Sequence, residues 1–128
     1  MRGRLLLVDD DAALLETLAM VLSQHDFEVA AVETVPEALQ AMAEKPFDLL
    51  LTDLSMPGDG FTVVREMHRM HPHAALLVLS GYMSAWQRAP ADARGMVHEY
   101  IAKPADAGVL VQTLERCLSA RSQATDSP

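Results

Sequence analysis

The chain has 128 residues, half of them hydrophobic, which predicts one globular domain with an apolar core. Eighteen acidic against ten basic residues give a formal net charge of −8, which disfavours direct binding to nucleic acid or to an anionic membrane surface. No apolar run approaches the roughly 18 to 20 residues of a membrane span, and the segment 1–7 is too short for a secretory signal. We therefore expect a soluble, cytoplasmic protein without membrane contact, and its one cysteine permits no internal disulfide.

The first half of the chain alternates short apolar runs with segments of helical spacing. Leu5 to Val8 are continuously apolar, as in a strand covered on both faces, and three aspartates then end the run. One of these aspartates can cap the helix that follows, and Thr34-Val35-Pro36-Glu37 has the form of a capping box before the next helix. The elements predicted in this half are strands over 4–9 and 27–32 and helices over 12–25 and 35–45.

The second half repeats this alternation but contains one irregular segment. Strands are predicted over 48–53, 74–79 and 96–102, and helices over 61–71 and 109–120. The stretch that follows Ser80-Gly81, up to Arg94, is predicted as a helix that Pro90 breaks or shortens. Residues 121–128 are polar and small. We expect one domain over residues 1–120, followed by a tail or the start of a linker.

A short apolar strand that runs into a loop rich in proline and glycine lies near the centre of the chain. Leu49 to Thr52 form the strand, and Asp53 stands where it becomes the loop that leads to Gly60. Open α/β sheets carry their reactive groups at this end of their strands. Asp53 is therefore the candidate reactive carboxylate.

Five strands alternating with five helices in a chain this short predict an α/β fold, a doubly wound parallel sheet with helices on both faces. The flavodoxin-like strand order 2-1-3-4-5 is expected, with a crevice at the carboxyl ends of the strands. The residues predicted at that edge are Asp9 and Asp10 after the first strand, Asp53 after the third, Ser80 after the fourth and Lys103 after the fifth.

Three carboxylates in one crevice repel one another, and a hard divalent cation with oxygen ligands relieves that repulsion. Mg²⁺ is the expected occupant. A carboxylate beside this cation and a lysine is a poor base but a usable nucleophile toward phosphorus, because both positive charges neutralise an incoming phosphoryl group. We therefore expect Asp53 to become an acyl phosphate.

Four short motifs fall at the predicted strand ends: Leu7-Val8-Asp9-Asp10, Asp53-Leu54-Ser55-Met56-Pro57, Leu79-Ser80-Gly81 and Tyr100-Ile101-Ala102-Lys103-Pro104. Together they resemble the receiver domain of bacterial two-component response regulators, over roughly residues 4–120. Each motif alone is weak, but four in this order are specific. The resemblance implies a phosphorylation-dependent signalling switch of a phosphorelay. It implies no enzyme activity beyond self-catalysed phosphorylation and dephosphorylation of the aspartate.

By this resemblance, Asp53 accepts a phosphoryl group from a phosphohistidine on a histidine kinase or a histidine phosphotransfer protein. The implied ligands of Mg²⁺ are Asp9, Asp10, Asp53 and the backbone carbonyl of Ser55. Lys103 is expected to bind a phosphoryl oxygen and to precede Pro104 through a cis peptide bond, as in the family.

The resemblance also implies a switch. Ser80 matches the hydroxyl that moves to hydrogen-bond the phosphoryl group, and Tyr100 matches the aromatic residue that turns inward with it. Phosphorylation is then expected to alter the face of the fourth helix, fifth strand and fifth helix, where a phosphorylation-dependent dimer can form. Gly81 fits the small residue needed beside the site. Ser55 and Tyr82 occupy positions that modulate loss of the phosphate, and the bulk of Tyr82 predicts slow dephosphorylation.

Two features depart from the family pattern. Only Gly58 separates Met56-Pro57 from Asp59-Gly60, where the family usually has two residues, so the loop beside the metal site is one residue short. Pro90 interrupts the usual regular fourth helix, which affects the output face more than the chemistry. The sequence contains no output domain, so the downstream effector, and the choice between a stand-alone receiver and part of a longer regulator, stay open.

Two other functional classes compete with this one. An enzyme of the haloacid dehalogenase type also uses a strand-end aspartate, Mg²⁺ and a lysine, but needs an acid two residues after its nucleophile, where this chain has Ser55. A pseudo-receiver keeps the fold without being phosphorylated, and the presence of Asp53 and Lys103 argues against it. Taken singly, the Asp9 to Asp11 run suits a helix cap, Lys103 a surface lysine, Ser80 a loop hydroxyl and Tyr100 an edge-strand residue, while His68, His71 and His73 are expected to be solvated.

Overall fold

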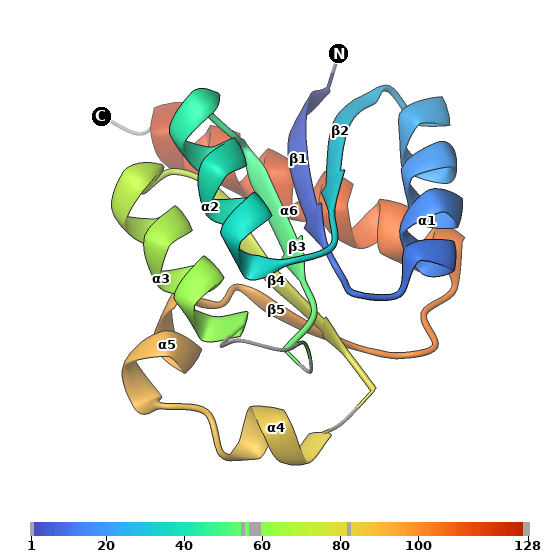
Figure 1. Ribbon diagram of the computed structural model, residues 1–128. Helices are drawn as coiled ribbons and strands as arrows, with labels where there is room; N and C mark the ends of the chain where they lie inside the picture. Colours follow the sequence, from blue (N-terminus) through green and yellow to red (C-terminus); the bar gives the residue numbers. More distant parts are fainter. Residues whose placement is uncertain (1, 55, 57–59, 82, 127–128) are drawn as a thin grey trace.

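Five parallel strands form one sheet in the order β2-β1-β3-β4-β5, as predicted (Figure 1). The structure is a computed structural model that describes residues 2–54, 56, 60–81 and 83–126. In chain order the elements are β1 (Gly3–Val8), α1 (Ala12–Gln24), β2 (Phe27–Val32), α2 (Val35–Glu44), β3 (Leu49–Thr52), α3 (Gly60–Met70), β4 (Ala75–Ser80), α4 (Met83–Gln87), α5 (Ala91–Met96), β5 (Glu99–Ala102) and α6 (Ala107–Asp126).

Helices cover the two faces of the sheet and bury two separate apolar clusters. Successive side chains of a strand point to opposite faces, so Leu6 and Leu50 pack under α2, α3 and α5, whereas Leu7 and Leu51 pack under α1 and α6. All four leucines are fully buried or nearly so. The continuous apolar runs of the inner strands therefore follow from burial on both faces.

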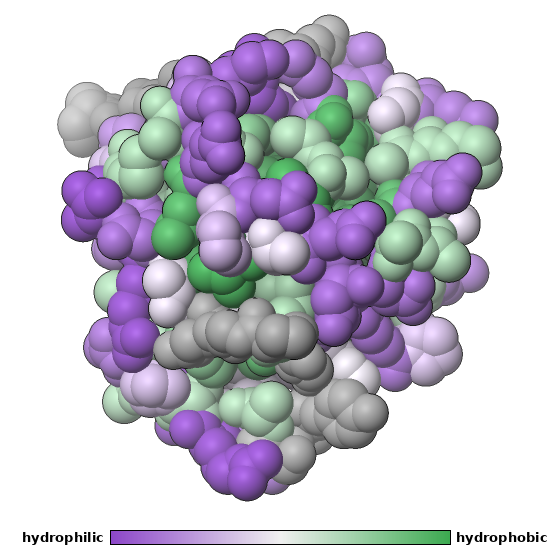
Figure 2. Space-filling view, in the orientation of Figure 1, coloured by the Kyte–Doolittle hydropathy of each residue, from purple (hydrophilic) through white to green (hydrophobic). Residues whose placement is uncertain are grey.

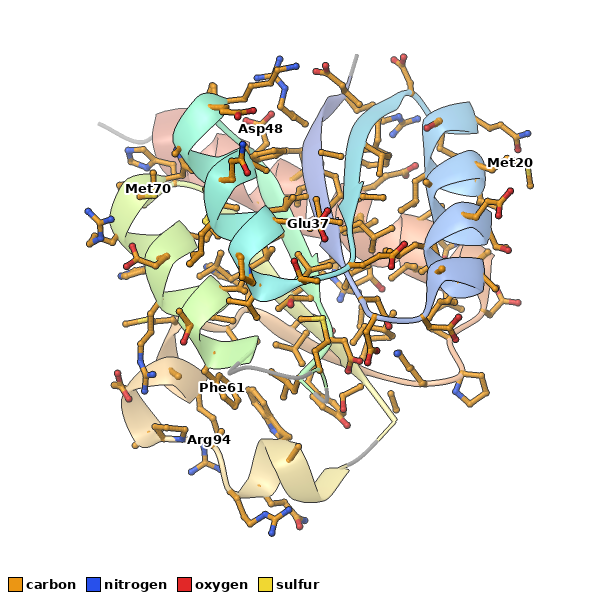
Figure 3. All side chains as sticks on the ribbon, in the orientation of Figure 1. Met20, Glu37, Asp48, Phe61, Met70 and Arg94 are labelled. Atoms are coloured by element: carbon orange, nitrogen blue, oxygen red, sulfur yellow. The ribbon has the colours of Figure 1, made fainter. Side chains whose placement is uncertain are left out.

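One face of the molecule carries mostly polar residues on its surface. Hydrophilic residues dominate the face shown in Figure 2, and hydrophobic residues show in smaller areas between them. Met20 on α1 is an exception, since it is 58% exposed and projects away from the sheet (Figure 3). Among the residues that the structure describes, no helix is both long and apolar enough to cross a membrane.

The predicted helix starts of the first half are confirmed, with their caps. The Asp11 carboxylate accepts a hydrogen bond from the Leu14 N–H at 3.1 Å at the start of α1. At α2 the Thr34 Oγ1 accepts from the Glu37 N–H at 3.2 Å, and the hydroxyl donates to the Glu37 carboxylate at 2.9 Å. The Glu37 side chain thus returns to the capping hydroxyl, a variant of the predicted capping box.

The segment predicted as one interrupted helix is two helices, so the described chain has six helices rather than five. Ala89 is buried, and Pro90 is the N-cap of α5 because its ring removes a donor that the first turn of a helix does not need. Met96 ends α5, so the fifth strand begins at Glu99 and not at Met96 as predicted. The intervening turn is closed by the His98 ring, whose Nδ1 accepts from the Leu76 N–H at 2.9 Å.

The last helix is longer than the sequence pattern indicates. It begins at Ala107 instead of Val109 and continues to Asp126, past the predicted end near Ala120. Leu110 and Leu114 are fully buried against the sheet, and Cys117 packs half-buried beside them. Burial raises the pKa of the Cys117 thiol, and the charge of Glu99 raises it further.

Candidate functional site

The carboxyl ends of four strands meet at one edge of the sheet, and each is followed by or ends in a residue that the sequence predicts to belong to the site. Backbone hydrogen bonds extend the ladder one residue past the strands: the Asp53 N–H donates to Val8 at 2.9 Å, and the Lys103 N–H donates to Ser80 at 3.0 Å. The Asp9 N–H likewise donates to Val32 at 3.2 Å, so Asp9 and Asp53 both have fixed backbone positions at the ends of neighbouring strands. This geometry follows from the parallel order alone.

Three carboxylates gather at this edge. Asp9 and Asp53 are 2% and 4% exposed, whereas Asp10 is exposed to solvent. One carboxylate oxygen from each can be chosen so that all three lie within 4.8 Å of one another. Two buried ligands and one open to water form a donor set that fits a hard, oxygen-preferring cation such as Mg²⁺.

The Lys103 ammonium lies inside this cluster. Its Nζ lies 2.6 Å from Asp9 Oδ2 and 3.5 Å from Asp53 Oδ2. Burial alone would lower the pKa of Lys103, but the hydrogen bond to Asp9 and the charges of Asp53 and Asp9 outweigh it, so the pKa is raised. The raised pKa thus favours the ammonium form of Lys103 beside the candidate nucleophile. The peptide bond between Lys103 and Pro104 is cis, as predicted.

Asp9 is oriented by two donors. Its Oδ1 accepts from the Asp11 N–H at 3.0 Å, and its Oδ2 accepts from the Lys103 ammonium. Because the two oxygens of one carboxylate point to different partners, the side chain has a defined rotation. Asp9 is therefore part of the connection between α1 and the end of β5.

Gly60 packs against the backbone of the candidate nucleophile, which sequence analysis did not anticipate. A Cβ placed on Gly60 would lie 2.8 Å from the Asp53 carbonyl oxygen and 3.0 Å from the Leu54 Cα. Real Cβ atoms do not approach backbone this closely, so only glycine fits the start of α3. Gly81, in contrast, has room for a Cβ, which would lie at an ordinary 3.8 Å from the Lys103 Cβ.

The two predicted switch residues lie together. Ser80 is fully buried at the end of β4, and the Tyr100 hydroxyl donates to the Ser80 carbonyl oxygen at 3.3 Å. The Tyr100 ring is half-buried and packs against Trp86 of α4, with ring centroids 5.3 Å apart and planes at 33°. Trp86 was not singled out from the sequence, since no local pattern relates it to a residue fourteen positions away.

Other predicted residues lie elsewhere. Ser55, Gly58 and Tyr82 fall outside the described residues, so their roles and the short loop remain predictions. His68 and His73 are exposed, as expected, but His71 is not simply solvated: its Nε2 contacts the Met42 carbonyl at the end of α2, 3.2 Å away. The metal-capable cluster found among the described residues contains no histidine.

An apolar pocket of about 350 Å³ adjoins the site on the side of α1 and α6. Its walls are Leu14 and Leu18 of α1, Leu79, Leu110 of α6, and the Lys103-Pro104-Ala105 segment. The Lys103 side chain is shared by this pocket and the carboxylate cluster. A molecule that fills the pocket therefore touches a residue of the charged site.

Comparison with known proteins points to one family. A family model described as the response regulator receiver domain matches residues 5–115. The chain is 33% identical over 117 residues to the response regulator protein FleR of Pseudomonas aeruginosa, an alignment that covers 91% of this chain and 24% of FleR. The chain spans about a quarter of the length of the curated relatives it matches.

Solved structures share the fold over most of the chain. One described as an adenylate cyclase from Rhodopirellula baltica is 32% identical, with a TM-score of 0.84 over 95% of this chain and 91% of that one. Another is the response regulator TrrA of Thermotoga maritima in complex with Mg²⁺ and BeF, 25% identical, with a TM-score of 0.78 over 89% of this chain and 97% of that one.

Proposed function

The chain belongs to the family of response regulator receiver domains, and from that membership we propose that it is a phosphorylation-dependent switch of a two-component phosphorelay, with Asp53 as the phosphoryl acceptor. The observation that carries the proposal is the Lys103 ammonium between Asp9 and Asp53, at 2.6 and 3.5 Å. As a structural ion pair, Lys103 would need only one buried acid as its partner. An ammonium that also lies near Asp53 suits a carboxylate that must accept a dianionic group.

The proposed reaction is a phosphoryl transfer. An Asp53 carboxylate oxygen attacks phosphorus, the bond between phosphorus and the donor imidazole nitrogen breaks, and the nitrogen keeps the electron pair. Lys103 then pairs with a phosphoryl oxygen, within reach of its present position. Mg²⁺, held by Asp9, Asp10, Asp53 and the Ser55 carbonyl, would neutralise negative charge at the same place. TrrA, solved with Mg²⁺ and BeF, supports this assignment by similarity.

The signal is proposed to pass from Asp53 to the α4-β5-α6 face. Ser80 turns its hydroxyl toward the new phosphoryl group, and Tyr100 moves with it because its hydroxyl already donates to the Ser80 carbonyl. Gly81 leaves space beside Lys103, and Tyr82 slows hydrolysis of the acyl phosphate. A dimer that depends on phosphorylation forms on this face.

The phosphoryl donor is proposed to be a histidine kinase or a histidine phosphotransfer protein. The pocket lined by Leu14, Leu18 and Pro104 offers an apolar contact next to Lys103, so a donor seated there brings its histidine toward Asp53.

We place the receiver within residues 1–120, in the cytoplasm, with 121–128 as a tail or the start of a linker to an output domain. The greater length of the curated relatives supports such a domain.

Intact mass after incubation with acetyl phosphate and Mg²⁺ tests the proposal. We expect a gain of one phosphoryl group that is absent in Asp53→Asn and without metal. Asp48→Asn is the matched control, because Asp48 directly precedes the same strand at its opposite end and should leave the gain intact. No gain in folded wild-type protein would contradict the proposal and favour a pseudo-receiver.

A further inference from the structure

Trp86, the only tryptophan of the chain, packs on the tyrosine that the proposed switch uses. The ring centroids of Trp86 and Tyr100 lie 5.3 Å apart, and the planes are tilted by 33°. Both side chains are half-buried and contact the cluster of core residues under α2, α3 and α5. The Tyr100 ring therefore contacts Trp86 while the Tyr100 hydroxyl donates to the Ser80 carbonyl.

The backbone that carries Trp86 is attached to the chain that follows α4. The Trp86 carbonyl accepts a hydrogen bond from the Ala89 N–H at 3.1 Å, and Ala89 is buried with only 8% of its surface exposed. Pro90 follows and fixes the start of α5. Trp86 is thus connected by one turn to the buried residue Ala89.

The helix that follows Ala89, α5, is held against α3. Arg65 donates to both carboxylate oxygens of Asp92, at 3.1 and 3.2 Å, and Ala93 is fully buried at the same place. A two-point pair of this kind fixes direction as well as distance. In Figure 1, α5 lies beside α3, whereas α4 extends toward the end of β4. The break at Pro90 therefore separates an anchored helix, α5, from a five-residue helix, α4, that carries Trp86 to Tyr100.

We propose that Trp86 is a positioning residue of the switch: it holds the Tyr100 ring in one orientation and so sets the balance between the two states of the Ser80–Tyr100 pair. This inference rests on the proposed function. Tyr100 cannot reorient without changing its contact with Trp86, and an aromatic pair of this geometry shifts an equilibrium by about two- to tenfold. The interaction energy of the Trp86–Tyr100 pair therefore changes the affinity for a phosphoryl group at Asp53.

The test uses beryllofluoride with Mg²⁺ as an inorganic mimic of the phosphoryl group. Binding is followed by the fluorine NMR signal of the bound ion, which does not depend on tryptophan. Trp86→Leu keeps apolar bulk and helix propensity but removes the ring, Trp86→Phe keeps a ring, and Gln87→Ala changes an exposed neighbour on the same helix. Thermal unfolding followed by circular dichroism shows that each variant is folded.

We expect Trp86→Leu to change the half-saturating beryllofluoride concentration about two- to tenfold, in either direction, while Trp86→Phe and Gln87→Ala stay within twofold. The direction tells which state the stack favours. In a Tyr100→Leu background the effect of Trp86→Leu should vanish, because Trp86 acts through Tyr100. An unchanged half-saturating concentration in Trp86→Leu, or a change that persists in Tyr100→Leu, overturns the inference. If wild-type protein binds no beryllofluoride, the proposed function fails instead.

Discussion

The Lys103 ammonium lies 0.9 Å closer to Asp9 than to Asp53, at 2.6 Å against 3.5 Å. The lysine therefore pairs mainly with a candidate metal ligand rather than with the candidate nucleophile. Under the proposed function, a cation that enters the carboxylate cluster would compete with Lys103 for Asp9 and would free the ammonium to pair with a phosphoryl group on Asp53.

Replacing Lys103 should separate metal binding from phosphorylation. Lys103→Met removes the competing charge, so we expect Mg²⁺ to bind about fivefold more tightly, which corresponds to about 1 kcal/mol. The rate of phosphorylation by acetyl phosphate should fall about 100-fold or more, because the charge that faces the incoming group is lost. Titration calorimetry measures the first effect and intact mass over time the second. Lys45→Met, at the other and exposed lysine of the chain, is the control. Weaker Mg²⁺ binding in Lys103→Met would contradict the competition.

The same ion pair should make stability depend on alkaline pH. The pKa of Lys103 is raised in the folded state, so its contribution is complete below the ordinary lysine value of about 10.4 and is lost as pH rises through the raised pKa. The size of this contribution should stay below about 1 kcal/mol, because the side chain keeps some contact with water. Urea unfolding of wild type and Lys103→Met between pH 8 and 11 measures it. Parallel curves for the two proteins would show that Lys103 contributes nothing.

The close approach of Gly60 to Asp53 predicts opposite results for two glycine substitutions. Gly60→Ala forces the Asp53 backbone to shift, which should lower the free energy of unfolding by about 1–3 kcal/mol and slow phosphorylation. Gly95→Ala adds a Cβ in α5 where no atom lies within 4 Å, so it should be neutral or stabilising by up to about 1 kcal/mol. Urea unfolding and intact mass distinguish the pair. Equal effects of the two changes would mean that the contact at Asp53 is not limiting.

The Arg65–Asp92 pair should hold α5 only above acidic pH. The hydrogen bond from Arg65 lowers the pKa of Asp92. Its stabilising contribution is therefore complete above the ordinary aspartate value of about 4 and is lost as pH falls through the lowered pKa. We expect Asp92→Asn to show a smaller loss of stability than wild type between about pH 5 and pH 2.5. Unfolding curves at these values measure the difference, with Glu16→Gln on the exposed face of α1 as control. The same acid dependence in Asp92→Asn and wild type would exclude a role for the pair.

The sequence was sufficient to predict where the charged residues meet. Asp9, Asp53 and Lys103 each follow an apolar run, and parallel strands bring the ends of such runs to one edge, whatever the details of the helices. A cap by one of the three aspartates and the cap at Thr34 were predictable for a local reason, because a cap depends on residues three positions apart, and the structure identifies the capping aspartate as Asp11.

Contacts between distant residues could not be predicted in this way. Arg65 and Asp92 are 27 positions apart, and Gly60 meets the Asp53 backbone only because of how the loop between them folds. Pro90 indicated a break, but the split into two helices depends on the burial of Ala89 and Ala93 by α3. The start of β5 was misplaced by three residues for the same reason. The apolar residues before it belong to α5 and its packing, not to a strand.

The half-buried thiol of Cys117 makes the last helix measurable by chemistry. The raised pKa of this thiol keeps the reactive thiolate scarce, and Cys117 packs against the core cluster that contains Leu114. Separation of α6 from the sheet would expose the thiol fully, so it should raise the rate of reaction with a thiol reagent. Because the chain has no other cysteine, the rate at which Cys117 is labelled reports on that separation. An increase in that rate would measure how often α6, which runs to Asp126, separates from the sheet.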